Sequence, residues 1–314
     1  MSSVDNFLSG FPHGGPFDLD DLEAYFRWRE AKLAGQPLRA EDLLVEIAEP
    51  GRPSDAERAA ILDRCRRANM AVYACRDRGE GLVPAEMKSR LAELGAAFGL
   101  HRLDRNLCAD EDGITALEVR AGGAAGEYIP YSNKPLSWHT DGYYNSADEQ
   151  VRGLILHCGR PAASGGANAL MDPDIAYIRL RDENPDFIRA LMHPQAMTIP
   201  ANNTGGTEIR PARVGPVFSV DPTGGALHMR YSARKVNVVW RDDSVTSAAV
   251  AFLTELLAGD GPDILHWRLE AGQGYIGNNV LHNRSAFGDG EGGGRLLYRA
   301  RYFDRMEGTG PTYD

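Results

Sequence analysis

The sequence is poor in cysteine, in long apolar runs and in basic clusters, and each absence excludes a class of protein. Its four cysteines show no C-x-x-C spacing, so we expect reduced thiols, with no structural zinc and no disulfide framework. No stretch approaches the roughly 18 apolar residues of a membrane-spanning helix. The first residues lack the charged-then-apolar pattern of a signal peptide. We therefore expect a cytoplasmic protein with no membrane partner.

Basic residues are outnumbered and do not form runs. The chain has 34 lysines and arginines against 44 acidic residues, a net charge of −10. Nucleic acid is therefore a poor candidate partner and a small molecule a better one. Whether the chain forms a homo-oligomer is open. The glycine-rich segments at 121–126 and 288–294 lack nucleotide-binding spacing and are expected to be loops, and no G-x-S-x-G motif of serine hydrolases is present.

Short apolar runs between glycine, proline and asparagine breaks dominate the chain from about residue 115 onward. Many short strands between turn signals are typical of a β-barrel or β-sandwich. Two helical inserts are predicted within this region, near 173–191 and 244–258. The segment Asn202–Gly206 has the composition of a loop that covers a site.

The part before this region is predicted to be helical and mixed. Helices are expected over 19–34, 55–68 and 85–98, the second because Ser54 and Glu57 have the spacing of a capping box. Met70–Cys75 reads as a short buried strand. No linker separates the two parts, so we expect one domain over 1–314. Residues 1–110 would form the buttress and 111–305 the β core.

The strongest chemical signal is the tripeptide His139-Thr140-Asp141. On a strand, residues two apart point to the same face, so both side chains would project together. A His-x-Asp pair and one distant histidine form the 2-His-1-carboxylate triad of non-haem Fe(II) sites, which leaves metal positions open for other ligands. The distant histidine comes from another strand, so its separation in the sequence is free.

We assign the distant ligand to His282, at the end of the apolar run Gly277-Asn-Asn-Val-Leu-His282. Arg295 follows a short way on, and a guanidinium is well suited to bind a carboxylate. A His-x-Asp pair alone is common by chance, and a surface or core histidine is its simpler interpretation. The joint pattern with His282 and Arg295 is far more specific. The other histidines are His13, His101, His157, His193, His228 and His266.

At these residues the chain resembles the taurine dioxygenase-like (TauD/TfdA) family of Fe(II)/2-oxoglutarate-dependent oxygenases. It is also similar to γ-butyrobetaine and trimethyllysine hydroxylases. The resemblance is carried by Trp138-His-Thr-Asp141, by Val280-Leu-His-Asn-Arg-Ser285 and by the strand Arg295-Leu-Leu-Tyr-Arg299. It extends over roughly residues 70–305.

The resemblance implies a mainly β protein with α-helices, built on a double-stranded β-helix, a distorted jelly roll with a cupin-like barrel. It implies Fe(II) as cofactor and 2-oxoglutarate and O2 as co-substrates. The implied reaction is decarboxylation of 2-oxoglutarate to succinate and CO2, coupled to hydroxylation of an unactivated C–H bond. An aspartate at 141 favours hydroxylation, desaturation or another hydrogen-abstraction outcome over halogenation, because halogenating relatives typically have a small residue there.

The resemblance also implies residue roles. His139, Asp141 and His282 match the iron ligands, and Arg295 matches the arginine that pairs with the distal carboxylate of 2-oxoglutarate. Asn168 stands where many relatives use a serine or threonine for that carboxylate. Its amide can also donate a hydrogen bond, so it is a candidate cofactor-binding residue.

The last strand and the aromatic residues suggest a substrate. Arg299 and Arg301 share the parity of Arg295, and three inward arginines need anionic partners. Arg299 is predicted to meet an anionic group of the substrate; pairing with a protein carboxylate, or a bulge that turns it outward, fits equally well. Tyr143 and Tyr144 are candidate substrate-binding residues, as part of an aromatic cage or, more simply, as lid and core packing.

The expected function is thus hydroxylation of a small, anionic or zwitterionic metabolite. One alternative is desaturation or ring closure by the same iron chemistry, which the mass of the product distinguishes. Another is a catalytically inert barrel that binds a small molecule and releases no succinate. The complete ligand set together with Arg295 argues against an inert barrel, since disuse gives no reason to retain all four residues.

Overall fold

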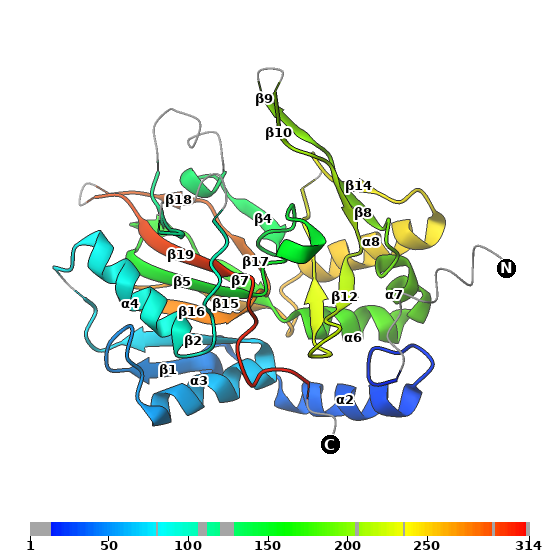
Figure 1. The fold of residues 1–314 in the computed structure, drawn as a ribbon, viewed down its shortest axis with the longest axis horizontal. Helices are drawn as coiled ribbons and strands as arrows, with labels where there is room; N and C mark the ends of the chain where they lie inside the picture. Colours follow the sequence, from blue (N-terminus) through cyan, green and yellow to red (C-terminus); the bar gives the residue numbers. More distant parts are fainter. Residues whose placement is uncertain are drawn as a thin grey trace.

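The structure, a computed structural model, describes residues 14–79, 81–105, 112–119, 129–204, 207–234, 236–290 and 293–311. In these residues helices and mostly antiparallel strands combine into a mixed α/β fold (Figure 1). The predicted loop at 121–126 lies outside the described residues, and so do parts of the one at 288–294. No helix in the described part of the chain is long and apolar enough to cross a membrane.

The largest sheet has six strands and combines the first and last parts of the chain. Only β1 and β2 pair in parallel; the other neighbours are antiparallel. Two separate cores cover its faces, because alternate residues of a strand point to opposite sides. In sheet order the strands are β1 (Leu44–Ile47), β2 (Met70–Cys75), β16 (Gln273–Asn278), β5 (Gly153–Arg160), β19 (Leu296–Tyr302) and β3 (Ile114–Leu117).

The outer face of this sheet is covered by helices from the N-terminal part. Ile61 and Cys65 of α3 (Asp55–Ala68) and Leu91 of α4 (Pro84–Ala96) are fully buried there. The capping box predicted at the start of α3 is present: the Ser54 hydroxyl accepts from the Glu57 backbone, and the Glu57 carboxylate accepts from the Ser54 backbone. Before them come α2 (Leu22–Gly35) and the 3-10 helix η1 (Ala40–Leu43).

A second antiparallel sheet lies against the inner face. Its strands, in order, are β15 (Leu265–Trp267), β7 (Asn168–Met171), β17 (Leu281–Arg284) and β4 (Leu136–His139). Leu170 and Leu265 of this sheet share one buried cluster with Leu154, Leu156 and Leu297 of the six-stranded sheet. The two sheets therefore enclose a common core. Two-residue strands β6 (Ser164–Gly165) and β18 (Phe287–Gly288) pair beside it.

A third core lies under the helices of the second half. The single helix expected near 173–191 is two helices, α6 (Pro173–Glu183) and α7 (Pro185–Leu191). Asn184 between them has φ −160° and ψ 115°, because the residue before a proline is driven out of the helical region. The predicted insert at 244–258 is α8 (Ser244–Ala258). Fully buried residues of all three helices belong to this core.

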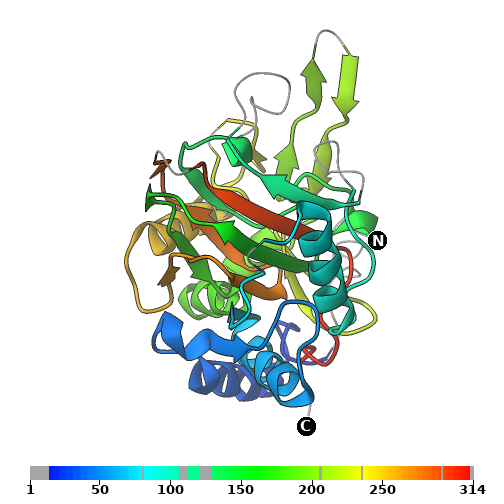
Figure 2. The ribbon, with the colours of Figure 1, turned by 90° about the vertical axis from the view of Figure 1, so that its left-hand side faces the viewer.

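Short strands complete this part. They are β8 (Met197–Ile199), β11 (Arg213–Gly215), β14 (Val239–Trp240), β12 (Phe218–Val220) and β13 (Leu227–Met229). The apolar run at 214–220 is therefore divided between two strands. The expected loop at 202–206 is also partly wrong: β9 (Asn202–Thr204) pairs with β10 (Thr207–Arg210). This hairpin projects well beyond the sheets (Figure 1, Figure 2). The 3-10 turns η2 (Ile129–Tyr131) and η3 (Ala147–Glu149) flank β4.

Candidate metal centre

Strand pairing brings His139 and His282 together. The two residues are direct partners in the antiparallel register of β4 and β17, and their ring centroids lie 4.3 Å apart. Asp141 follows two residues after His139, just past the end of β4. One ligand atom from each of the three buried residues lies within 4.8 Å of the others. Strand pairing thus joins the two histidines, and Asp141, which lies outside the strand, completes a compact three-residue cluster.

Both imidazoles present the same nitrogen to the cluster. Nδ1 of His139 lies 2.9 Å from the Ser137 carbonyl, and Nδ1 of His282 lies 2.9 Å from the Val280 carbonyl. A carbonyl only accepts, so each Nδ1 carries the hydrogen and each Nε2 keeps its lone pair. Burial, reinforced by the neighbouring His139, lowers the pKa of His282 to about 4. The His282 ring is therefore neutral near pH 7, as a metal ligand must be.

The Asp141 carboxylate offers one free oxygen. Its Oδ1 lies 3.4 Å from Arg299 Nη1, whereas its buried Oδ2 has no hydrogen-bond partner. Burial alone would raise the pKa of Asp141, but Arg299, His139 and Arg301 together hold this pKa well below its usual range. A buried, charged oxygen without a partner is costly unless a ligand completes it. The free Oδ2 and the two Nε2 atoms fit a divalent metal ion.

The backbone of Asp141 is held by an asparagine side chain. Asn279 Oδ1 accepts from the Asp141 N–H at 2.8 Å, and Asn279 Nδ2 donates to the Asp141 carbonyl at 2.7 Å. The same Nδ2 donates to the Val151 carbonyl at 2.7 Å. Asn279 lies three residues before His282. It therefore ties the segment that carries one candidate ligand to the backbone of another.

Arg295 provides a buried positive charge. The residue is 5% exposed, and its guanidinium lies 5.0 Å from the centre of the Phe287 ring. Burial lowers its pKa from the ordinary value. Within the described residues the Arg295 guanidinium forms no ion pair with a carboxylate. A buried guanidinium without a counter-charge is suited to bind the carboxylate of a small molecule.

The other predicted residues have protein partners. Arg299 contacts Asp141, the protein-carboxylate alternative for this residue. Asn168 already donates one amide hydrogen to the Asn283 carbonyl at 2.8 Å. The Tyr143 ring lies edge-on to His139, with centroids 6.4 Å apart, and the Tyr144 hydroxyl accepts from Arg301 at 2.8 Å. The substrate and cofactor roles of these residues stay predictions.

Sequence reasoning missed two residues of the site. Asn279 lies in the apolar run that ends at His282, but nothing in the local sequence shows that it reaches Asp141. Tyr275 on β16 is fully enclosed, its ring lies 6.3 Å from that of His282, and burial, then Asp141, raise its pKa. Tyr275 lies on the inner face of β16, as the alternation of side chains along a strand requires. The sequence alone does not give the pairing register of β16, so this position could not be predicted.

Comparison with known protein families identifies the family of this chain. Residues 83–301 match the family described as "Taurine catabolism dioxygenase TauD, TfdA family". The chain belongs to this family. The match covers both histidines, the aspartate and all three inward arginines, and it confirms the resemblance to the TauD/TfdA oxygenases. The likeness to γ-butyrobetaine and trimethyllysine hydroxylases stays a prediction.

Individual relatives of the family share only part of the sequence. A uridine-5'-phosphate dioxygenase from Amycolatopsis sp. is 36% identical over 99 residues, 30% of this chain and 33% of that protein. One from Streptomyces sp. is 27% identical over 176 residues, 55% of this chain and 62% of that protein. The chain thus spans less than two thirds of each of these relatives.

A solved structure shows the same fold over most of the chain. The asparagine oxygenase complex with Fe(II), 2S,3S-3-hydroxyasparagine and succinate superposes with a TM-score of 0.54 and 16% sequence identity. The match covers 88% of this chain and 89% of that one. At this identity the similarity establishes the mixed α/β oxygenase fold.

Proposed function

We propose that the protein is an Fe(II)- and 2-oxoglutarate-dependent dioxygenase that hydroxylates a small anionic metabolite. The observation that carries this proposal is the cluster of His139, Asp141 and His282, in which both Nε2 atoms carry lone pairs and Asp141 Oδ2 has no hydrogen-bond partner. Membership of a dioxygenase family supports it. Fe(II), 2-oxoglutarate and O2 together supply an oxidant strong enough for an unactivated C–H bond and release succinate and CO2.

The residues around the cluster have separable roles in this proposal. His139, Asp141 and His282 hold the metal. Arg299 and Arg301 keep the Asp141 carboxylate ionised, so that it is ready to bind a cation. Arg295 binds the far carboxylate of 2-oxoglutarate, because its buried guanidinium forms no ion pair with a carboxylate in the described residues. Asn168 has one amide hydrogen left with which to assist.

We further propose that the two facing sheets form a double-stranded β-helix and that the whole chain is one domain. The antiparallel pairing of β5, β16 and β19 on one side and of β7, β17 and β4 on the other supports the barrel. The N-terminal strands β1 and β2 join the same sheet as the C-terminal β19. The N-terminal buttress and the β core on either side of residue 110 therefore contribute strands to one sheet.

The anionic substrate is supported by the relatives and by charge. Both curated relatives are named as acting on uridine 5'-phosphate, and the net charge of −10 contrasts with a local concentration of arginine around the site. Uridine 5'-phosphate and related phosphate monoesters are therefore the first substrates to test. A phosphate monoester carries close to two negative charges near neutral pH.

Anaerobic titration of metal-free protein with Fe(II) and then 2-oxoglutarate tests the proposal. The expected result is the visible charge-transfer band of the Fe(II) chelate in wild type, and its loss in His139→Ala and Asp141→Ala. Arg58→Ala, on the exposed surface of α3, is the matched control and should retain the band. A folded wild type without the band would refute the cofactor assignment.

Turnover is tested next by succinate release and by the mass of the product. One added oxygen atom establishes hydroxylation. A loss of two hydrogens would instead establish desaturation or ring closure by the same site.

A further inference from the structure

Three arginines gather at the base of the projecting hairpin without any acidic partner. Arg210 ends β10, Arg213 begins β11 and Arg230 directly follows β13. In the described chain none of the three forms an ion pair with a carboxylate. They influence one another: burial and then Arg213 lower the pKa of Arg210, and burial and then Arg210 lower that of Arg230 to about 10. The cluster is therefore a local excess of positive charge in an acidic protein.

Backbone contacts hold two of these arginines in place. Arg230 is 8% exposed and donates to the carbonyls of Tyr143 at 2.8 Å and Arg213 at 2.9 Å. Arg210 donates to the carbonyl of Pro200 at 2.7 Å. Carbonyl acceptors orient a guanidinium but leave its charge uncompensated. These two charges are thus fixed in position, and Arg230, which also donates to the Met197 and Pro216 carbonyls, acts on a ligand mainly through its charge.

Arg213 is the member with free donors. Its buried Nε has no hydrogen-bond partner, although the side chain is only partly buried. The nearby Asp148 is exposed; its pKa is lowered chiefly by Ser146 and least by Arg213. A buried guanidinium N–H without an acceptor is unfavourable. An external anion would satisfy both this donor and the surplus charge.

Arg213 and Arg230 line a cavity of about 200 Å³ that adjoins the candidate metal centre. Asp141 and Tyr143 also line it, and the Tyr143 ring lies edge-on to His139. Polar side chains such as Asn145, Ser146 and Gln150 also line it, together with apolar residues that include Val214 and Pro216. The volume is far above the roughly 10–15 Å³ that a single water needs. A ligand group held there would lie beside Asp141, one of the three candidate metal ligands.

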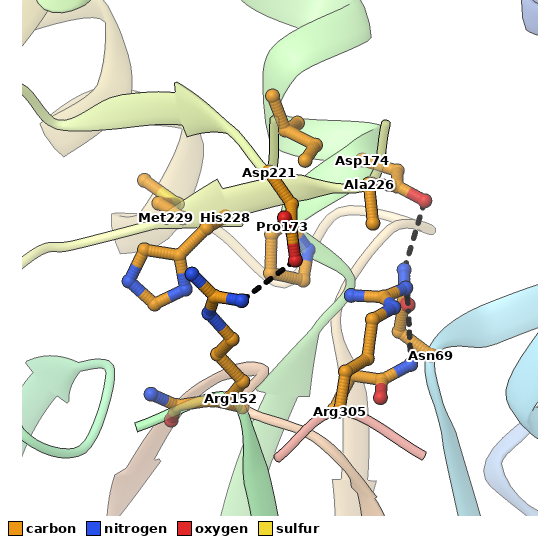
Figure 3. A pocket seen from close by; sticks show the side chains of 12 residues that line it. Asn69, Arg152, Pro173, Asp174, Asp221, Ala226, His228, Met229 and Arg305 are labelled. Atoms are coloured by element: carbon orange, nitrogen blue, oxygen red, sulfur yellow. Dashed lines mark hydrogen bonds and ion pairs between the residues drawn. The ribbon is translucent and has the colours of Figure 1, made fainter. Parts of the chain in front are cut away.

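A second polar cavity shows what a purely structural charge cluster looks like in the same protein (Figure 3). It measures about 20 Å³, and its two carboxylates, Asp174 and Asp221, are paired within the chain, although the buried Nε of Arg305 has no hydrogen-bond partner there either. Arg152 pairs with Asp221 at 2.6 Å, and Asp174 receives both Lys32 at 2.7 Å and the Asn69 amide at 2.8 Å. The arginine cluster at the hairpin base lacks such compensation and borders a space ten times larger.

We propose that Arg213 and Arg230 line a subsite for a dianionic phosphomonoester on the substrate, to which the neighbouring Arg210 adds positive charge. The inference rests on the proposed function, because it assigns the part of the molecule that binds the substrate anion. A dianion matches a cluster of three cations better than a single carboxylate does. The assignment moves the substrate anion away from Arg299, whose guanidinium is engaged with the Asp141 carboxylate.

The test compares the affinities of uridine 5'-monophosphate and uridine by anaerobic calorimetry. The wild type is measured loaded with Fe(II) and 2-oxoglutarate, and again metal-free. We expect the monophosphate to bind at least about tenfold more tightly than the nucleoside, since charge-assisted hydrogen bonds are involved. No preference for the phosphate, whether the two bind equally or neither binds, overturns the proposal.

Variants locate the subsite. Arg213→Gln should reduce but not remove the preference, and Arg210→Gln with Arg213→Gln should abolish it. Arg230 is left intact because its bonds hold the backbone. Arg58→Gln is the matched control and should keep the wild-type preference. A preference that survives in the double variant places the phosphate elsewhere and sinks the assignment.

The charge-transfer band of the Fe(II) chelate is recorded on the same samples. If the band forms but the phosphate preference is absent, the subsite is wrong and the proposed function stands. If the preference exists without the band, the cofactor assignment fails and the subsite stands.

Discussion

Asn279 holds Asp141 by both of its backbone groups, through hydrogen bonds of 2.8 Å to the N–H and 2.7 Å to the carbonyl. The side-chain amide of Asn279 thus pairs with the Asp141 backbone as a neighbouring β-strand would. Because Asn279 precedes His282 by three residues, the contact fixes two candidate ligands relative to each other. The precision of the metal centre therefore depends on an amide that does not touch the metal.

Asn279→Ala is expected to weaken Fe(II) binding. The variant removes three hydrogen bonds and frees the Asp141 backbone, and supporting partners of metal ligands typically contribute about 10–100-fold in affinity. The measurement is anaerobic Fe(II) titration in the presence of saturating 2-oxoglutarate. Asn203→Ala, on the exposed face of the hairpin, is the control. An Fe(II) affinity equal to wild type in a folded Asn279→Ala protein would contradict the positioning role.

Arg295→Ala is expected to raise the KM for 2-oxoglutarate by about tenfold to a hundredfold, because a buried charge-assisted contact is lost. Fe(II) binding should change little, since Arg295 is not among the three clustered ligand residues. Initial rates of succinate release at varied 2-oxoglutarate measure the effect, with Arg58→Ala as control. An unchanged KM would mean that another residue binds the distal carboxylate.

Local patterns predicted the elements whose causes are local. The capping box at Ser54 placed the start of α3, and the apolar run over Met70–Cys75 matched β2 residue for residue. The Asn184-Pro185 pair signalled a helix break that was overlooked, so one insert was expected where two helices form. The strand at Asn202–Thr204 was missed because its pairing partner, not its composition, makes it a strand.

Some features of the candidate site also follow from local sequence patterns, and others depend on the fold. The His-x-Asp spacing predicts a shared direction for two side chains, and the structure adds His282 through the register of β17 against β4. The contact of Asn279 with Asp141 spans 138 positions in the sequence, so no local periodicity reveals it. The cluster of Arg210, Arg213 and Arg230 depends on three separate strands meeting, which composition alone cannot show.

Asp263 supports a prediction about acid stability. Its carboxylate accepts from Arg179 Nε at 2.7 Å and from the Gln36 amide at 3.0 Å. Burial opposes ionisation, but these partners hold the pKa of Asp263 below its usual range. A lowered folded pKa contributes stability that is present above the unfolded value of about 3.9 and is lost as the pH falls through the folded value.

Asp263→Asn should therefore lower the free energy of unfolding at neutral pH by about 1–3 kcal/mol. The difference from wild type should shrink as the pH falls below about 4. Urea unfolding at several pH values measures it, with the exposed Asp242→Asn as control. A difference that stays constant across this range would show that the carboxylate charge is not the cause.

Gly277 tests how closely β16 must approach its neighbour. A Cβ at this position would overlap the Asn69 carbonyl oxygen and lie 2.7 Å from the Met70 Cα. Both obstacles are backbone, which cannot move aside as a flexible side chain can, so β16 or β2 must shift. Gly277→Ala is expected to destabilise the protein by about 1–3 kcal/mol, the usual range for overpacking.

The displacement should also reach the metal centre, because Gly277 precedes Asn279 by two residues. We expect weaker Fe(II) binding in Gly277→Ala, together with its lower stability in urea. Gly261→Ala is the matched control, since a Cβ there meets no atom within 4 Å, and it should leave both quantities near wild type. If Gly277→Ala loses stability but keeps the wild-type Fe(II) affinity, the grip of Asn279 on Asp141 is independent of the exact position of β16.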